Sequence, residues 1–200
     1  FFFFFLMINL ESTKFEKVIK IVTAGPLFGG RTAIIRKFQT GLFSEWYKTT
    51  IGCDFGRKKL TFPDIDIDVL IYDINGRDLN DRLLPMWLRE ASGAMIVFDP
   101  NDDFVKDRFD IVRKWKQKID EYALTSTKKP IPCVLICNKC DLYKKEEVEE
   151  KYNIQQFVAD NNFINYFMTS AKNGTNINES FEYLVKYILD HYIEPYIIQD

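Results

Sequence analysis

The segment GPLFGGRT at residues 25–32 constrains the fold of this chain more than any other stretch. It follows an apolar run at residues 18–23 and opens a helix-like segment at residues 33–38. A strand, a glycine-bearing turn and a helix in this order direct backbone N–H groups and the positive end of the helix dipole at one anion. Phosphate-binding loops have the pattern G-x-x-x-x-G-K-[ST]. This chain has Gly25, Gly30 and Thr32, but Arg31 replaces the lysine.

Predicted strands and helices alternate along the chain. Strands are expected at residues 17–23, 53–62, 65–73, 94–98, 132–137 and 163–168, and helices at residues 32–39, 107–122, 146–157 and 177–192. The turn Pro63-Asp64 joins two strands directly, whereas continuous apolar runs such as residues 94–98 are typical of buried parallel strands. The pattern predicts an α/β fold: a six-stranded, mostly parallel sheet with one antiparallel edge strand and helices on both faces.

Composition limits the classes of partner and compartment. The chain has 200 residues, enough for one domain with a substantial core. Its net charge of −2 argues against a nucleic-acid partner held by bulk electrostatics. The cysteines are too few and too clustered for a disulfide framework, so a reducing, cytoplasmic setting is expected; they are Cys53, Cys133, Cys137 and Cys140. Cys137 and Cys140 form a C-x-x-C, but no second ligand pair supports a redox or zinc site.

The two ends of the sequence stand apart from this pattern. Residues 1–16 form an extension whose apolar start, residues 1–8, is too short to span a bilayer and lacks the features of a signal peptide. It is interpreted as part of a longer chain, as an upstream extension before a start at Met7, or as an arm buried against a partner. Residues 193–200 form a short tail without cysteine, so no prenylation signal or lipid anchor is readable.

Four short motifs follow the phosphate loop in a fixed order, the first after a polar loop at residues 41–50 and the other three at the ends of predicted strands. They are Thr50-Ile51-Gly52, Asp73-Ile74-Asn75-Gly76, Asn138-Lys139-Cys140-Asp141 and Ser170-Ala171-Lys172. With these motifs, residues 17–192 resemble a Ras-like G domain, the single P-loop domain of the small GTPases. The resemblance implies that the ligands are GTP or GDP and Mg²⁺.

The resemblance also implies a role for each motif. Asp141 would accept hydrogen bonds from the guanine N1–H and amine, an arrangement that adenine does not offer, and Asn138 would join the base edge to the phosphate loop. Lys139 and Phe43 would cover the base, Ala171 N–H would meet the guanine carbonyl, and Ser170 and Lys172 would brace their loop. Thr32, Thr50 and Asp73 would hold Mg²⁺. The expected nucleotide-binding residues are Gly25, Phe28, Gly29, Gly30, Arg31, Thr32, Ala33, Phe43, Thr50, Gly76, Asn138, Lys139, Asp141, Ser170, Ala171 and Lys172.

Within this superfamily the chain resembles the Rab proteins. Residues 51–55, IGCDF, are similar to the Rab segment after the first switch, and Phe55, Tyr72 and Trp87 stand where Rabs carry an aromatic triad. Residues 89–94, 114–116 and 130–135 look like the Rab branch of lysosome-related organelles and mitochondria. The resemblance implies effector binding through Ile51 and the triad, at an organelle surface or within a large complex. Ordinary core packing is the alternative for the three aromatics.

Departures from the family pattern gather around the expected γ-phosphate. Arg31 replaces a compact ammonium with a wide planar fork. Phe28 stands at a position usually held by glycine, where a positive φ would cost about 1–3 kcal/mol, and Leu27 adds bulk beside it. Arg77 stands where the family has the glutamine that orients the attacking water, and a guanidinium only donates hydrogen bonds. No intact catalytic residue is therefore expected, and hydrolysis is predicted to be very slow or lost.

Three functions follow from this combination. The first is a Rab-like protein that binds guanine nucleotide, hydrolyses it very slowly and recognises partners through its switch regions. The second is a pseudo-GTPase that serves as an interaction or structural subunit of a larger assembly, through the switch regions or the N-terminal arm. The third is a competent switch in membrane trafficking, to which a partner supplies the missing water-positioning group.

Overall fold

The computed structural model describes residues 15–45, 50–75, 79, 82–101 and 108–192. Its strands are β1 (Phe15–Ala24), β2 (Cys53–Thr61), β3 (Ile65–Ile74), β4 (Gly93–Phe98), β5 (Cys133–Cys137) and β6 (Asn165–Met168). Its helices are α1 (Arg31–Thr40), α2 (Leu84–Leu88), α3 (Arg108–Tyr122), α4 (Lys145–Tyr152), α5 (Ile154–Asp160) and α6 (Ile177–Tyr192), with a 3₁₀ turn, η1, at Cys140–Leu142.

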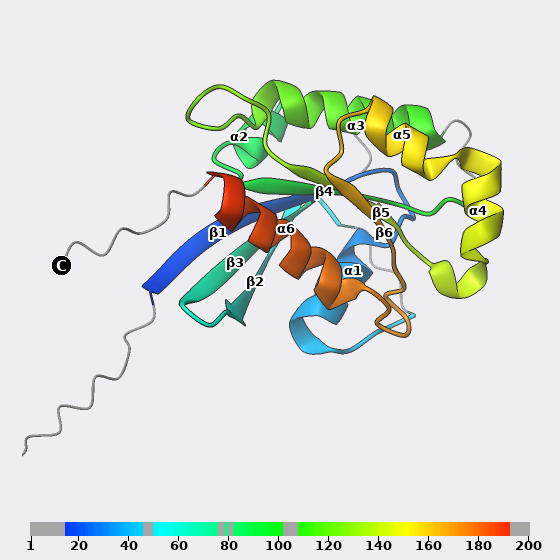
Figure 1. Cartoon of the computed structure of the whole chain (residues 1–200), viewed down its shortest axis with the longest axis horizontal. Helices are drawn as coiled ribbons and strands as arrows, with labels where there is room; N and C mark the ends of the chain where they lie inside the picture. The colour runs from blue at the N-terminus through cyan, green and yellow to red at the C-terminus, as the bar shows by residue number, and fades with distance from the viewer. Residues whose placement is uncertain (1–14, 46–49, 76–78, 80–81, 102–107, 193–200) are drawn as a thin grey trace, which may run out of the picture.

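The strands form one sheet in the order β2-β3-β1-β4-β5-β6, which Figure 1 shows running through the middle of the molecule. The β2–β3 pair is antiparallel, and the other neighbouring pairs are parallel. The predicted six-stranded α/β sheet with one antiparallel edge strand is therefore confirmed. Strand order reverses between β1 and β4, where β1 leads into residues 25–30, and such a switch point is where open α/β sheets bind ligands.

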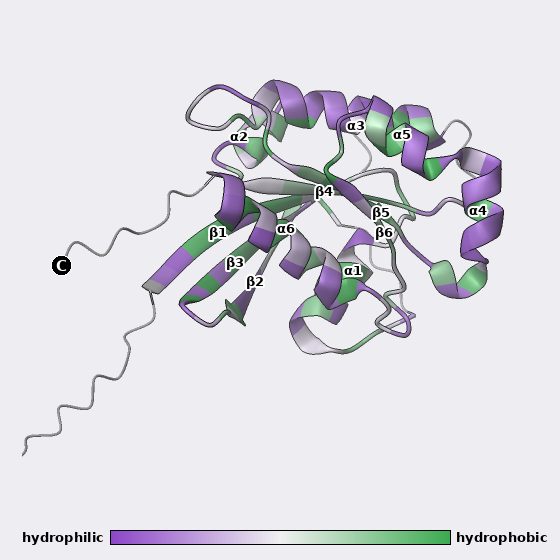
Figure 2. Cartoon of the chain, viewed as in Figure 1, coloured by the Kyte–Doolittle hydropathy of each residue, from purple (hydrophilic) through white to green (hydrophobic). Residues whose placement is uncertain are grey.

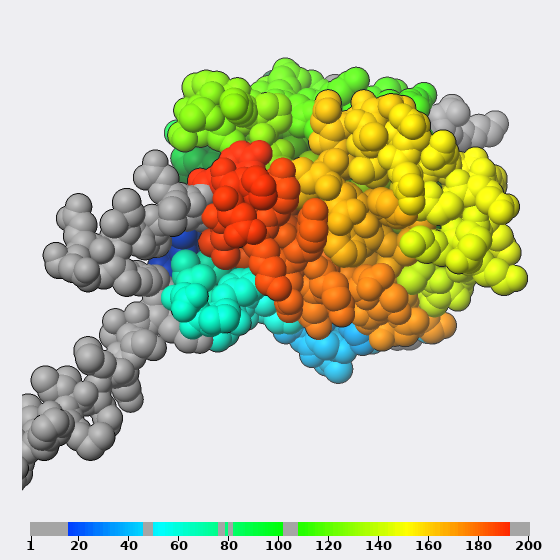
Figure 3. Space-filling model, viewed as in Figure 1, coloured from blue at the N-terminus to red at the C-terminus, as the bar shows by residue number. Residues whose placement is uncertain are grey.

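Helices cover the sheet on both faces, as predicted. On one face, α1 and α6 bury Ile34, Phe38 and Phe181 against odd-numbered residues of β1 such as Ile19 and Ile21. On the other face, residues of α2, α3 and α5 form a second core cluster, which includes Val22 and Ala24 of the same strand. Figure 2 shows hydrophobic and hydrophilic residues interspersed along β1 and β3, and Figure 3 shows α6, in orange to red, crossing one face of the molecule.

Two helical segments differ from the prediction. The single helix expected at residues 146–157 is wrong: it is two helices, α4 and α5, separated at Asn153, which has a left-handed φ of 45°. The Asn153 side chain accepts a hydrogen bond from Gln156 N (3.4 Å) and so caps the second helix. The short helix α2 was not predicted, because its five residues are too few to display a helical period.

Candidate functional site

The phosphate loop, residues 25–30, lies directly against the backbone of β4. A Cβ atom built on Gly29 would lie 2.7 Å from Val97 O, and one on Gly25 would clash with the same oxygen. Gly25 and Gly30 also have positive φ values of 132° and 86°. These positions therefore admit only glycine, because any side chain would push the loop away from the sheet or strain its backbone.

Phe28 occupies a left-handed backbone conformation in this loop, with φ of 62°. The positive φ whose cost was considered for this position is therefore present. Its ring is half exposed and lines the cavity described below. The loop thus carries backbone strain at a position beside the expected phosphates.

Replacing Phe28 with glycine is expected to raise the free energy of unfolding by about 1 kcal/mol, because glycine adopts this φ without a steric cost. Urea denaturation measures the difference. The matched control is Leu27→Gly at the neighbouring position, which has no positive φ and should be destabilised by about 0.5–1 kcal/mol. Equal destabilisation of both variants would contradict the strain at Phe28.

Arg31, the first residue of α1, turns its buried side chain beneath the loop. Its Nη1 donates to Gly25 O and to Pro26 O, the latter at 3.1 Å. Its Nε lies 3.4 Å from Asp73 Oδ1 at the end of β3. The guanidinium therefore joins two carbonyls of the loop to the carboxylate expected at the metal site, a contact that sequence reasoning did not foresee.

The three residues expected to hold Mg²⁺ converge. Thr32 Oγ1 donates to Asp73 Oδ2 and lies 3.1 Å from Thr50 Oγ1, and Thr50 Oγ1 reaches the same carboxylate oxygen at 3.5 Å. Burial raises the pKa of Asp73, and the nearby Arg31 charge and the Thr32 hydrogen bond oppose that rise. Asp73 Oδ1 is buried and accepts no hydrogen bond within the described residues.

This donor set fits Mg²⁺, which prefers carboxylate and hydroxyl oxygens. Within the described part of the chain, no cluster of three or more His, Cys, Asp or Glu side chains forms another candidate metal site.

Asn138, at the end of β5, joins the phosphate loop to the loops expected to read the base. Its fully buried side chain donates from Nδ2 to Gly29 O at 2.9 Å. Its Oδ1 accepts from Thr169 Oγ1 at 3.2 Å and from Ala171 N at 3.3 Å. A Cβ on Gly30 would collide with Nδ2. The predicted link between Asn138 and the phosphate loop is thus present in the geometry.

Asp141 is held by a hydrogen bond from Ser170, the residue before Ala171. Ser170 Oγ donates to Asp141 Oδ1 at 2.6 Å and accepts from Asn173 N at 3.3 Å, so Ser170 fixes both its own turn and the carboxylate. Lys139 pairs with Asp99 at the end of β4 at 3.0 Å. Lys172 is exposed.

Two supporting residues were missed by sequence reasoning. Asp99 follows the buried run of β4, and its position at a strand end was the available signal. The half-buried Tyr143 donates from its hydroxyl towards Cys137 O (3.0 Å) and Asn138 O (2.9 Å), and burial raises the pKa of this phenol. No pattern in the sequence distinguishes this tyrosine from its neighbours.

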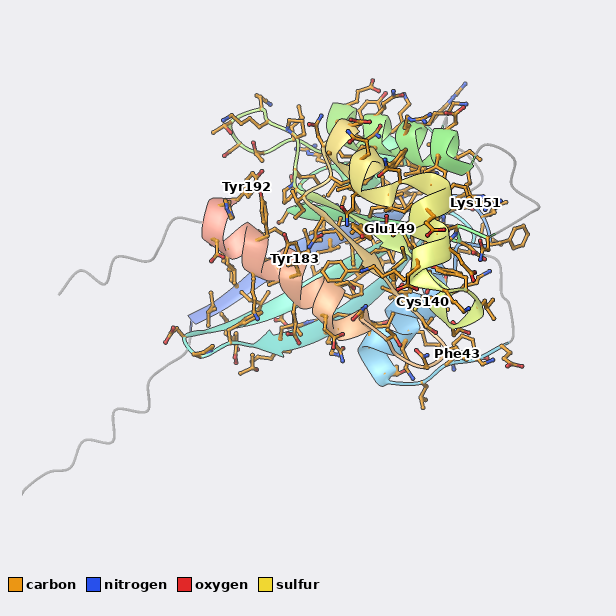
Figure 4. The ribbon with its side chains drawn as sticks, turned by 45° about the vertical axis from the view of Figure 1, so that its right-hand side comes forward. Phe43, Cys140, Glu149, Lys151, Tyr183 and Tyr192 are labelled. Carbon is orange, nitrogen blue, oxygen red and sulfur yellow. The ribbon has the colours of Figure 1, made fainter. Side chains whose placement is uncertain are left out.

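A cavity of about 590 Å³ opens over the phosphate loop. Its lining includes Leu27, Phe28, Gly30, Arg31, Thr32, Ala33, Arg36, Phe43, Ser44, Glu45, Thr50, Asn75 and Lys139. Phe43, which follows α1, and Cys140, which begins η1 next to Lys139, lie on the same side of the molecule in Figure 4. Asp141, Ser170, Ala171 and Lys172 do not line this cavity, but Asn138 connects their loops to it.

Gly76 and Arg77 lie outside the described residues. The expectations for both, including that for the water-positioning site, stay predictions.

The residues expected to bind effectors differ in exposure. Ile51 and Phe55 are exposed, by 90% and 64%, and Phe55 packs edge-on against Tyr72, with ring centroids 4.7 Å apart. Trp87 is 8% exposed and belongs to the core cluster beneath α2. Three of the four thus present side-chain surface, whereas Trp87 contributes mainly to packing.

The cysteines have no arrangement suited to redox chemistry. All four are free; Cys133 and Cys137 are buried, and burial raises the pKa of Cys53 to about 12. Such thiols stay protonated near neutral pH and react poorly.

None of the described helices has the length and apolar character needed to cross a bilayer.

Comparison with known proteins identifies a family that matches most of the chain. Residues 20–190 match the Ras family. The chain is 37% identical over 176 residues to the Ras-related protein Rab-32A of Dictyostelium discoideum, covering 87% of this chain and 79% of that protein. It is 36% identical over 175 residues to Ras-related protein Rab-32 of Mus musculus, covering 87% and 77%. It is 30% identical over 172 residues to the human Ras-related protein Rab-7L1, covering 86% and 82%.

Proposed function

The chain belongs to the Ras family as a Rab-type small GTPase, and we propose that it holds GTP or GDP with Mg²⁺ but hydrolyses GTP very slowly. The observation that carries this proposal is the contrast between the two ends of the site. Asn138 and Ser170 hydrogen-bond the proposed base-reading loops to the phosphate loop and to each other's neighbours, whereas Phe28 and Arg31 alter the phosphate end.

At the base-reading end, the groups available match guanine. The Asp141 carboxylate, oriented by Ser170, can accept from the two donors on the N1 edge of guanine. Ala171 N, which is proposed to meet the guanine carbonyl, donates in this structure to Asn138 Oδ1, which also accepts from Thr169 Oγ1. Because a site built to satisfy particular donors rejects a base that lacks them, this end selects guanine over adenine.

At the phosphate end, the loop N–H groups and the first turn of α1 provide a site for anions. Thr32, Thr50 and Asp73 would hold Mg²⁺, which would neutralise phosphate charge there. Phe28 and Leu27 bring bulk to the side of the cavity where an attacking water or an activating partner must approach. Slow hydrolysis therefore follows from steric obstruction together with the absence of a glutamine at Arg77.

Single-turnover hydrolysis of bound GTP tests the hydrolytic part of this proposal. We expect a slow wild-type rate and a rate about tenfold faster in Arg77→Gln, because one hydrogen bond that orients the water is worth roughly 1–1.5 kcal/mol. The matched control, Arg82→Gln, should leave the rate unchanged. Equal, fast rates in the wild type and in Arg77→Gln would contradict the claim that the catalytic end is eroded.

Partner recognition is proposed to use the exposed apolar residues beside the cavity, Ile51 and Phe55, together with Tyr72. Thr50 joins this segment to the metal-site residues, so the ligand state can influence it. The proposed location is the cytoplasm or the periphery of an organelle.

A second candidate function is a pseudo-GTPase that acts as an interaction subunit. The Arg31–Asp73 ion pair favours it, because the carboxylate of the metal site already has a cation beside it. Partner binding that is the same with GDP, with a GTP analogue and without nucleotide would support this candidate; two nucleotide-dependent sets of partners would exclude it.

A further inference from the structure

Arg31 places a permanent positive charge at the buried side of the proposed Mg²⁺ site. Its side chain and that of Asp73 are only 8% and 4% exposed, and Nε lies 3.4 Å from Oδ1. A guanidinium stays protonated at any pH at which the protein folds. The buried carboxylate therefore has a cation next to it whether or not a metal is bound.

The position of this charge is set by the fold. Arg31 Nη1 donates to Gly25 O and Pro26 O, both in the phosphate loop. The loop in turn lies against Val97 O, which leaves no room for a side chain at Gly25. The guanidinium is thus anchored between the phosphate loop and the end of β3. Arg31 also lines the cavity above the loop, so its charge acts on an anion bound there.

A divalent cation at this site would lie near the positive charge of the Arg31 guanidinium. Asp73 shares its negative charge between Arg31 on Oδ1 and the Thr32 and Thr50 hydroxyls on Oδ2. In a buried site of low dielectric, a nearby like charge weakens cation binding. The same guanidinium attracts phosphate oxygens, so it contributes to the task that the metal performs.

We propose that Arg31 substitutes for part of the charge of Mg²⁺, so that the pocket retains a nucleoside diphosphate with only weak dependence on the metal. This inference rests on the proposed function, because it requires a bound guanine nucleotide. Linkage gives a second consequence: if the metal adds little to nucleotide affinity, the nucleotide-loaded protein binds the metal weakly.

The test is the release of a fluorescent GDP analogue from the full chain into excess GDP, in excess Mg²⁺ and in excess EDTA. Chelation should accelerate release by less than about threefold in the wild type and by more than about tenfold in Arg31→Lys. An ammonium is a single point charge that cannot hold the loop carbonyls and Asp73 together, which returns the carboxylate to the metal.

The matched control is Arg57→Lys, which changes another Arg–Asp pair, with Asp68, on the exposed surface of β2. It should keep the wild-type response to EDTA.

Calorimetric titration of Mg²⁺ into the GDP-loaded proteins gives an independent readout, with weaker binding expected in the wild type than in Arg31→Lys.

Equal acceleration by EDTA in the wild type and in Arg31→Lys overturns the inference while leaving the proposed function intact. Should Arg31→Lys not fold, the wild type decides alone: release accelerated by less than about threefold in EDTA supports the inference, and a greater acceleration overturns it. A wild type that takes up no GDP analogue in either buffer contradicts the proposed function itself.

Discussion

Replacing Asn138 with alanine is expected to lower the free energy of unfolding by about 3 kcal/mol and to weaken guanine-nucleotide binding on the order of 100-fold. Three buried groups lose their partner at once: Gly29 O, Thr169 Oγ1 and Ala171 N. The loop that contains Ala171 also loses its attachment, through Asn138, to the phosphate loop. Chemical denaturation and titration with a fluorescent GDP analogue measure the two effects.

Asn161→Ala is the matched control for this prediction. Asn161 follows α5 and donates from its side chain to Phe157 O at 2.7 Å, away from the cavity. It should cost about 1 kcal/mol of stability and leave nucleotide affinity unchanged. Equal losses of nucleotide affinity in both variants would mean that Asn138 acts only through general stability.

Asp141→Asn is expected to change base selectivity from guanine to xanthine, by a factor on the order of 10³ or more. The carboxylate accepts two hydrogen bonds, whereas the amide accepts one and donates one. Xanthine presents an N1–H donor beside a carbonyl acceptor, which the amide matches, and guanine presents two donors, which it does not. Competition between GDP and xanthosine diphosphate for the bound fluorescent analogue measures the change.

The exposed Asp190 of α6 provides the control Asp190→Asn, which should bind GDP as the wild type does. Asp141→Asn with unchanged preference for GDP would show that this carboxylate does not read the base. Because Ser170 donates to Asp141 Oδ1, the amide oxygen is expected to take that position and the amide nitrogen to face the ligand.

Most of the sheet could be predicted because its strands are either continuous apolar runs or clear alternations. β4 and β5 are buried at every position, and β3 buries Ile67, Val69 and Ile71 on one face. The secondary-structure predictions that were wrong concern short helical segments. The division between α4 and α5 depends on a left-handed backbone at Asn153, and the apolar spacing of residues 146–157 carries no sign of it.

Part of the candidate site could be predicted because its motifs resemble those of a Ras-like G domain. Asn138, Asp141 and Ser170 are examples, since each stands in such a motif after a strand of the sheet. The Arg31–Asp73 pair could not be predicted, because the rotamer of a long side chain depends on residues far away in the chain. For the same reason the contact between Tyr143 and the carbonyls of Cys137 and Asn138 was missed.

The proposed base-reading end, around Asn138 and Asp141, and the phosphate end, around Phe28 and Arg31, are expected to affect nucleotide binding differently. At the proposed base-reading end, the side chains of Asn138 and Asp141 are already hydrogen-bonded to their neighbours, and such preorganisation increases affinity. The phosphate end contains backbone strain at Phe28 and a resident cation at Arg31. A protein with this combination is expected to retain a nucleotide better than it hydrolyses one.

Identification of the nucleotide that the purified protein carries tests this account most directly. Heat-denatured protein should release GDP or GTP in a near one-to-one ratio to the chain, measured by ion-exchange chromatography and mass spectrometry. Adenine nucleotide in the same fraction, or no nucleotide together with no binding of added GDP, would contradict it.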